Sequence, residues 1–184
     1  MINLDIVDQM VILVILVEFS IEGNDVGPHT FEPEFFPRTG VVLKCTNDLD
    51  KVVYYGLGPN ENYVDSKEAA YMDVFETDVD GLFTNYVYPQ ENGHHEGCEW
   101  LSLGDKVRFE FGKPVGFNVS KYSDEKIEEA KHPYELVEDG YLTLHIDAAM
   151  SGLGSNSCGM EQKQEDKVRR GPFNLEFSIE PLNN

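Results

Sequence analysis

The chain has 184 residues, a length suited to one all-β domain, and it carries 34 acidic against 14 basic residues, a net charge of −20. Proteins bind nucleic-acid phosphates and anionic membrane surfaces mainly through Lys and Arg, so this charge argues against both as partners. It favours a solvated, acidic surface.

The first predicted element is a β-strand in the apolar run 10–17, which continues with alternating residues to 21. The run has eight residues, whereas a helix that spans a bilayer needs about 20. Asp5 and Asp8 precede it in place of basic residues, which argues against a signal peptide. Its β-branched content predicts a strand of the sheet core. Three cysteines without framework spacing, at 45, 98 and 158, then indicate reduced thiols and a cytoplasmic protein.

After a loop at 22–39, apolar and polar residues alternate with a period of two. This pattern predicts half-buried antiparallel strands at 107–111, 117–119, 142–146 and 173–179, and we expect further strands at 41–45, 52–55, 83–88 and 98–103. Good helix formers predict a short helix at 66–72, and an N-cap candidate, Ser123, predicts another at 123–131. The polar stretch 159–171 is expected to be exposed. The sequence therefore predicts an all-β, antiparallel two-sheet sandwich with two short helices, and excludes a (β/α)8 barrel.

Residues 54–65, which read YYGLGPNENYVD, form the most specialised segment of the chain. A β-rich run ends at Gly56, and Gly58-Pro59 predicts a sharp reversal with Gly58 at positive φ. The side chains that follow can bond the backbone of the loop itself. Two later segments are similarly specialised: YVYPQENG at 86–93 and SGLGSNSCG at 151–159.

In this order, the three segments resemble the C-terminal, fifth domain of the family-2 glycoside hydrolase β-galactosidases. The resemblance covers residues 38–182 of a single domain 1–184, with 1–37 as a leading strand and loop. It implies an antiparallel supersandwich related to galactose mutarotases. The residues expected to hold its motif loops are Gly56, Gly58, Pro59, Glu61, Asn62, Tyr63, Asp65, Pro89, Glu91, Asn92 and Gly93.

Glu61 and Glu91 are candidates for the two carboxyl groups of a retaining glycosidase, but their turn-residue neighbours favour hydrogen bonds to backbone N–H groups. In the family that the chain resembles, both catalytic glutamates and the Mg and Na sites belong to a central barrel domain. No part of this chain matches that domain. The resemblance therefore implies an inactive chain without cofactor. It would work with the remaining domains or large subunit of a β-galactosidase on galactosides such as lactose, either as a cut fragment or as part of a small subunit.

Cys158, with Asn156 and Ser157, is the candidate substrate contact. The resemblance places this loop on the acceptor-sugar side of the active site, where one branch of the family has a tryptophan and other branches have a cysteine. A cysteine offers a sugar only a small apolar contact, so we expect weaker stacking there than a tryptophan would give. The alternative is a buried cysteine that packs the loop.

The segment His94-His95-x-x-Cys98 invites a zinc interpretation. Adjacent residues of an extended segment point to opposite sides, and a fourth ligand is missing, so we expect no metal and place these histidines in a domain interface near Trp100. His145, on the polar face of its strand, is expected to be solvated or hydrogen-bonded at the surface.

Two functions of other classes stay open. A stand-alone sugar epimerase of the aldose-1-epimerase type is suggested by His132-Pro133-Tyr134, which partly resembles a mutarotase motif. A carbohydrate-binding module would need a row of exposed aromatic side chains, and the chain has one tryptophan, Trp100.

Overall fold

The computed structural model describes residues 2–3, 13–20, 35–154 and 159–182, and only the backbone in the first two ranges. Its strands are β1 (Ile2–Asn3), β2 (Leu13–Ser20), β3 (Arg38–Cys45), β4 (Lys51–Gly58), β5 (Tyr71–Asp78), β6 (His95–Leu103), β7 (Val107–Ser120), β8 (Leu142–Met150) and β9 (Pro172–Pro181). The α-helices are α1 (Val79–Leu82) and α2 (Asp124–Glu129), and short 3-10 helices lie at Asn47–Leu49, Pro133–Glu135 and Gln164–Asp166. No helix of these ranges is long and apolar enough to cross a membrane.

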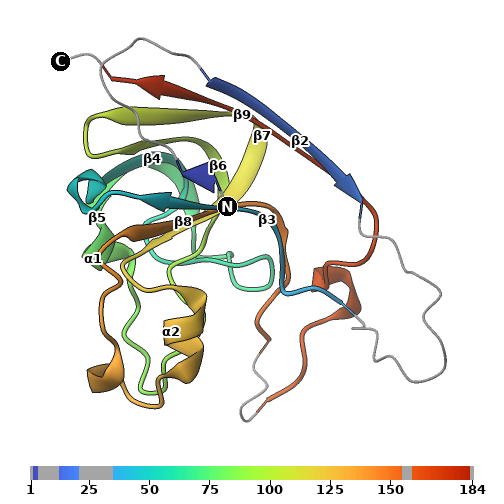
Figure 1. Ribbon diagram of the computed structural model, residues 1–184. Coiled ribbons are helices and arrows are strands. Elements are labelled where there is room, and N and C mark those ends of the chain that lie inside the picture. Colours follow the sequence, from blue (N-terminus) through green and yellow to red (C-terminus); the bar gives the residue numbers. More distant parts are fainter. Residues whose placement is uncertain (1, 4–12, 21–34, 155–158, 183–184) are drawn as a thin grey trace, which may run out of the picture.

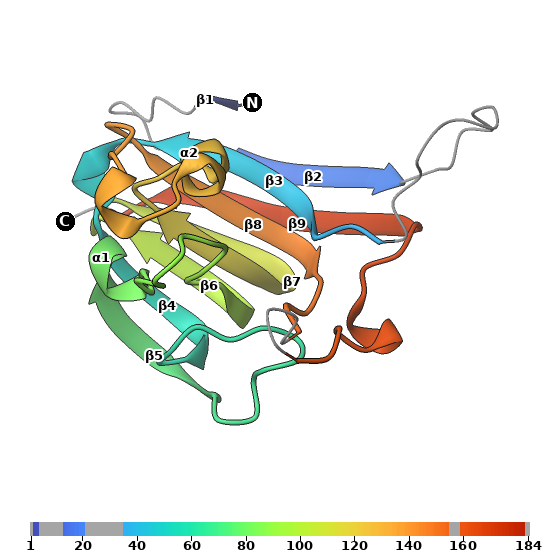
Figure 2. The same ribbon diagram turned by 90° about the horizontal axis from the view of Figure 1, so that it is seen from below.

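The strands form a strongly curved sheet in the order β1-β3-β8-β7-β6-β4-β5, and all pairs except β1–β3 are antiparallel. The sheet divides into two branches along the long strand β7. Residues 107–111 of β7 pair with β9, which in turn pairs with β2, and residues 116–120 pair with β8, which in turn pairs with β3. The predicted strands 107–111 and 117–119 are thus one strand. The predicted N-terminal strand is confirmed as β2, which pairs with β9 away from β5 (Figures 1 and 2).

The core lies between the inner faces of the two branches. Leu175, Phe177 and Ile179 of β9 share one buried cluster with Leu43 of β3 and Leu144 of β8, although β8 and β9 contact each other without pairing. Burial of this apolar surface is the main force that holds the branches together. The predicted all-β, antiparallel sandwich is confirmed.

The helix predicted at 66–72 is wrong. Residues 66–70 form turns, with Ala70 N–H donating to the carbonyl of Lys67, and the chain then enters β5. Helix propensity is a weak preference, and eight residues of β5 pair with β4 instead. The helix predicted at 123–131 is confirmed as α2, with Ser123 at its N-cap position.

The strand predicted at 83–88 is also wrong, because this segment is a loop that pairs with no strand of the described chain. Its backbone is held by side chains: Thr84 N–H donates to Asn92 Oδ1 at 3.0 Å. The stretch 159–171 is exposed over much of its length, as predicted, but Lys167 within it is buried.

Gly58 is required for space and not for an unusual φ. It lies before a cis peptide bond to Pro59, and it is absent from the described glycines with positive φ, so that prediction was wrong. A Cβ atom on Gly58 would overlap the Tyr54 hydroxyl and lie 2.8 Å from Cε2 of Phe75.

We therefore expect Gly58→Ala to destabilise the chain by about 1–3 kcal/mol, the usual cost of overpacking a well-packed site. Gly171→Ala is the matched control, because an added Cβ there meets nothing within 4 Å. Urea unfolding of both variants is the measurement. Equal midpoints would show that the Tyr54 ring can move aside without cost.

Candidate functional site

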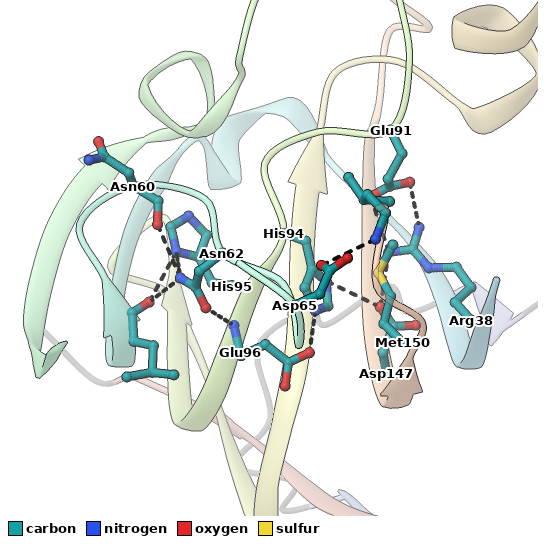
Figure 3. A network of polar contacts seen from close by, with 12 residues as sticks. Arg38, Asn60, Asn62, Asp65, Glu91, His94, His95, Glu96, Asp147 and Met150 are labelled. Carbon is teal, nitrogen blue, oxygen red and sulfur yellow. Dashed lines mark hydrogen bonds and ion pairs between the residues drawn. The ribbon is translucent and has the colours of Figure 1, made fainter. Parts of the chain in front are cut away.

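Asn62 fixes the loop that follows β4. Its Nδ2 donates to the carbonyls of Leu57 and Asn60, both at 3.0 Å, and its Oδ1 accepts the N–H of Glu96 at 2.9 Å (Figure 3). Its own N–H donates to the carbonyl of His94 at 2.8 Å. Because Asn62 is buried, these bonds are shielded from water and lock the 59–65 loop onto the start of β6.

The second segment is tied to the first by Glu61. One carboxylate oxygen of Glu61 accepts the N–H of Gly93 at 2.6 Å, and the other accepts the hydroxyl of Tyr86. Gly93 has φ +72°, and a Cβ there would lie 2.8 Å from the carbonyl oxygen of Leu82. This position therefore requires glycine. Asn92 closes the turn, because its Nδ2 donates to the carbonyl of Gln90 at 2.9 Å, and Pro89 next to this turn is buried.

Asp65 ties the third segment to the first. Its two carboxylate oxygens accept the N–H of Leu153 at 3.2 Å and the N–H of Gly154 at 2.7 Å. A Cβ on Gly152 would overlap this carboxylate, so the close approach depends on glycine. Ser151 anchors the same segment, because its hydroxyl donates to Phe36 O and accepts Val168 N–H, both at 2.7 Å.

A buried network of charges lies between these loops and the sheet (Figure 3). Arg38 of β3 donates to Asp147 of β8 at 2.9 Å and to Glu91 at 3.3 Å. The ring of His94 lies between Asp147, at 3.6 Å, and Glu96, at 3.0 Å. A Cβ on Gly116 would overlap this ring. The network thus fastens the 86–93 loop to the sheet through Glu91.

Burial and charge act in opposite directions within this network. Burial opposes the charge of Arg38, but Asp147 and Glu91 outweigh it, so the pKa of the guanidinium is raised. At Glu91, burial raises the pKa of the carboxyl although Arg38 works to lower it. Of the three charged groups Arg38, Glu91 and Asp147, only Asp147 has an almost completely buried side chain, with 2% exposed, against 17% for Arg38 and 30% for Glu91. Arg38 is therefore the cation that lies closest to the buried Asp147 carboxylate, at 2.9 Å.

The three segments meet at a hollow of about 980 Å³. Its walls carry the buried Tyr63, Tyr86 and six carboxylates, from Glu61, Asp65, Glu68, Glu161, Glu165 and Asp166. Carboxylates accept hydrogen bonds from hydroxyl groups, and the half-buried Tyr86 offers a ring that can stack on an apolar surface, whereas Tyr63 already stacks on His94. A wall of this kind suits a neutral polyhydroxylated molecule better than an anion.

His95 occupies a different environment from its neighbour His94. Its Nδ1 lies 3.1 Å from both the Tyr54 hydroxyl and the carbonyl of Leu57, inside the core. Burial lowers the pKa of His95 from its ordinary 6.5 to about 4, and the carbonyl of Leu57 only partly opposes this effect.

The unfolded chain binds a proton at His95 near pH 6.5, whereas the folded chain does not until about pH 4. This contribution to stability is therefore complete above pH 6.5 and is lost as the pH falls through that interval, by roughly 2 kcal/mol between pH 7 and pH 5. Urea unfolding at both pH values should show a smaller loss in His95→Asn than in the parent. A His95→Asn variant that loses as much stability as the parent would show that His95 does not cause this pH dependence.

The remaining histidines correct two expectations. His94, which directly precedes β6, and His95, its first residue, are both buried within this domain and not exposed at an interface. Cys98 donates to the carbonyl of Trp100, and the described residues contain no cluster of three or more His, Cys, Asp or Glu suited to a metal. His145 is buried and not solvated, because β8 is covered on both faces, and its Nε2 lies 3.1 Å from Asp124 Oδ1.

The structure does not favour the epimerase suggested by His132 or the carbohydrate-binding module that would use Trp100. His132 is exposed, directly precedes the 3-10 helix Pro133–Glu135 and stacks on Tyr134, so it is not a strand histidine in a sugar pocket. One face of Trp100 is covered by the guanidinium of Arg108, 4.0 Å from the ring centroid. That face is closed to a sugar ring.

Cys158, Asn156 and Ser157 lie outside the described residues, so only the start of their loop, up to Gly154, is placed. Sequence reasoning missed Arg38 and Asp147. Asp147 lies on a strand whose alternation suggests a solvated face, and its partner is 109 residues away. No local signal connects the two.

Comparison with known proteins gives a consistent result. The sequence model of the family described as β-galactosidase small chain matches residues 4–179. The chain is 37% identical over 162 residues to a β-galactosidase of Actinobacillus pleuropneumoniae, and the aligned segment covers 88% of this chain and 16% of that protein. It is 35% identical over 144 residues to one of Arthrobacter sp. (strain B7), covering 73% and 14%. It is 30% identical over 155 residues to one of Kluyveromyces lactis, covering 81% and 15%. The chain thus spans about one-sixth of the length of these relatives or less.

Proposed function

The chain belongs to the β-galactosidase small-chain family, and from this premise we propose that it is a non-catalytic domain of a retaining β-galactosidase. In this proposal it shapes the acceptor side of an active site whose catalytic residues lie elsewhere in the enzyme. The enzyme would hydrolyse terminal β-D-galactosides such as lactose in the cytoplasm. Mg and Na would be bound by its catalytic domain and not by this chain.

The observation that carries the proposal is the meeting of the three specialised segments at one hollow. Hydrogen bonds of Glu61 and Asp65 connect the three segments, so the hollow is a built feature. Its exposed carboxylates and the half-buried Tyr86 match the hydroxyl groups and apolar faces of a sugar. This chemistry supports contact with an acceptor sugar that lies partly outside the catalytic pocket.

The contacts of Glu61 and Glu91 support a non-catalytic role. A nucleophile and an acid/base must be free to exchange protons and to form a bond with the sugar. Glu61 accepts the Gly93 N–H and the Tyr86 hydroxyl, and Glu91 is paired with Arg38. Both carboxyl groups are occupied in holding loops.

Within this proposal, Cys158 contacts the acceptor sugar, with Asn156 and Ser157 beside it. Support comes from Asp65, which holds Leu153 and Gly154 at the start of this loop beside the hollow. Such a contact affects the transfer of galactose to an acceptor more than cleavage of an activated galactoside, because it is absent from the bond-breaking transition state.

The test uses the isolated chain and a chimera in which it replaces the matching segment of the Actinobacillus β-galactosidase. The isolated chain should show no turnover of a chromogenic β-galactoside, and the chimera should be active. In the chimera, Cys158→Trp should change the effect of added glucose on product partition while galactosyl-enzyme formation changes little. Activity of the isolated chain that disappears in Glu61→Gln or Glu91→Gln would contradict the proposal.

A further inference from the structure

The outer face of β4, β5 and β6 carries a continuous apolar surface. Along β4, Val52, Tyr54 and Gly56 face the core, and the alternate residues point to the opposite face. The strand register places Met72 beside Leu57, and both Val74 and Trp100 beside Tyr55. We define the outer patch as Val53, Tyr55, Leu57, Met72, Val74 and Trp100.

The outer patch is exposed and firmly supported. Met72 is 40% exposed and Val74 54% exposed, and the other members are half-buried. Gly97 lies beneath them, so that a Cβ on it would contact Leu57 Cγ at 3.4 Å and Met72 Sδ at 3.6 Å. Further along the same face, the sheet becomes polar at Arg108 and Glu180, which pair across β7 and β9. An apolar patch with a polar rim is typical of a protein interface.

Acidic residues of β5, at the edge beside the patch and on its face, argue against a second copy of the chain as its occupant. Strand β5 forms one end of the sheet and pairs only with β4 among the described strands (Figure 2). Its residues Asp73, Glu76 and Asp78 are all exposed. Glu76 lies on the face of the patch itself, because it pairs with Val53 in the strand register. A second copy that joined this edge or covered this face would bring these carboxylates together in two chains that each carry a net charge of −20.

We propose that the outer patch is the surface on which the rest of the β-galactosidase packs. This inference rests on the proposed function. The matching family is described as the small chain of the enzyme, and at least 84% of the Actinobacillus relative lies outside the segment that this chain matches. That large remainder supplies an occupant, whose contact surface should be apolar to match the patch and not acidic because of the carboxylates beside it.

Oxidation of methionine by hydrogen peroxide, read by peptide mass spectrometry, tests the inference in the isolated chain and in the chimera. Peroxide converts accessible methionine to its sulfoxide, so the rate reports exposure. Met72 should be oxidised readily in the isolated chain and several-fold more slowly in the chimera. Met150, which is buried in the chain itself, is the internal control and should be oxidised slowly in both.

A pair of variants sharpens the result. Val74→Lys places a charge in the outer patch, so in the chimera it should weaken the packing of the rest of the enzyme on this face. Met72 should then be oxidised faster, and proteases should cleave the chain faster than in the parent chimera. Asn174→Lys, at an exposed position of β9, should leave both unchanged.

If the chimera is active but its Met72 is oxidised as fast as in the isolated chain, the outer patch is not the contact surface, and the proposed function still stands. An inactive chimera with Met72 protected would support the docking face and contradict the proposed function. Dimers of the isolated chain in sedimentation, with Met72 protected at high concentration, would overturn the inference in favour of a second copy.

Discussion

Replacement of Arg38 by methionine is expected to destabilise the chain by about 3–5 kcal/mol, because it leaves a buried carboxylate without its partner. Asp147 has only 2% of its side chain exposed, and Arg38 donates to it at 2.9 Å. The methionine would fill most of the space without supplying a positive charge. The free energy of unfolding in urea at pH 7 is the measurement.

Lys51→Met is the matched control for this prediction. Lys51 also contacts two carboxylates, Glu76 at 3.2 Å and Asp105 at 3.1 Å, but all three groups are largely exposed. Water solvates their charges, so this variant should unfold close to the parent. The double variant Arg38→Met/Asp147→Leu should recover part of the loss, since it removes the buried charge. If Arg38→Met unfolds like Lys51→Met, Asp147 is not held by Arg38.

The strands could be predicted from the sequence where local alternation coincides with burial on one face. This holds for β9, in which Leu175, Phe177 and Ile179 face the core and the residues between them do not. The same pattern is missing in β5, because both of its faces are largely exposed. The sequence therefore placed Tyr71 and Met72 at the end of a predicted helix. Its strand state comes from pairing with β4, a long-range interaction that the local pattern does not contain.

The sequence predicted which residues form the site but not which distant segments their hydrogen bonds join. The motif residues Glu61, Asn62 and Asp65 were recognised, and Glu61 accepts a backbone N–H as its turn neighbours suggested. The identity of that donor, Gly93, and the contact of Asp65 with Gly154 join segments 32 and 89 residues apart. A single sequence does not encode such distances in any local pattern. Glu91 departs from the prediction, because Arg38 binds it in place of a backbone group.

Replacement of Asp65 by alanine is expected to reduce the response of the chimera to acceptor sugar about tenfold, the factor that corresponds to roughly 1.4 kcal/mol. The carboxylate holds Leu153 and Gly154 by two hydrogen bonds, at 3.2 and 2.7 Å. Without it, the start of the proposed acceptor loop loses its fixed position beside the hollow. Cleavage of an activated galactoside without acceptor should change much less, since the reacting bond is held elsewhere.

Two further variants separate positioning by Asp65 from general destabilisation. Gly152→Ala should reproduce the effect of Asp65→Ala, because the added methyl group overlaps the carboxylate and displaces it. Asp65→Asn keeps one acceptor oxygen and should recover part of the acceptor response. Product partition at increasing glucose, measured beside the melting temperature of each chimera, distinguishes the two effects. If all three variants lower the rate with and without glucose to the same extent, Asp65 serves only the stability of the fold and not the position of the loop.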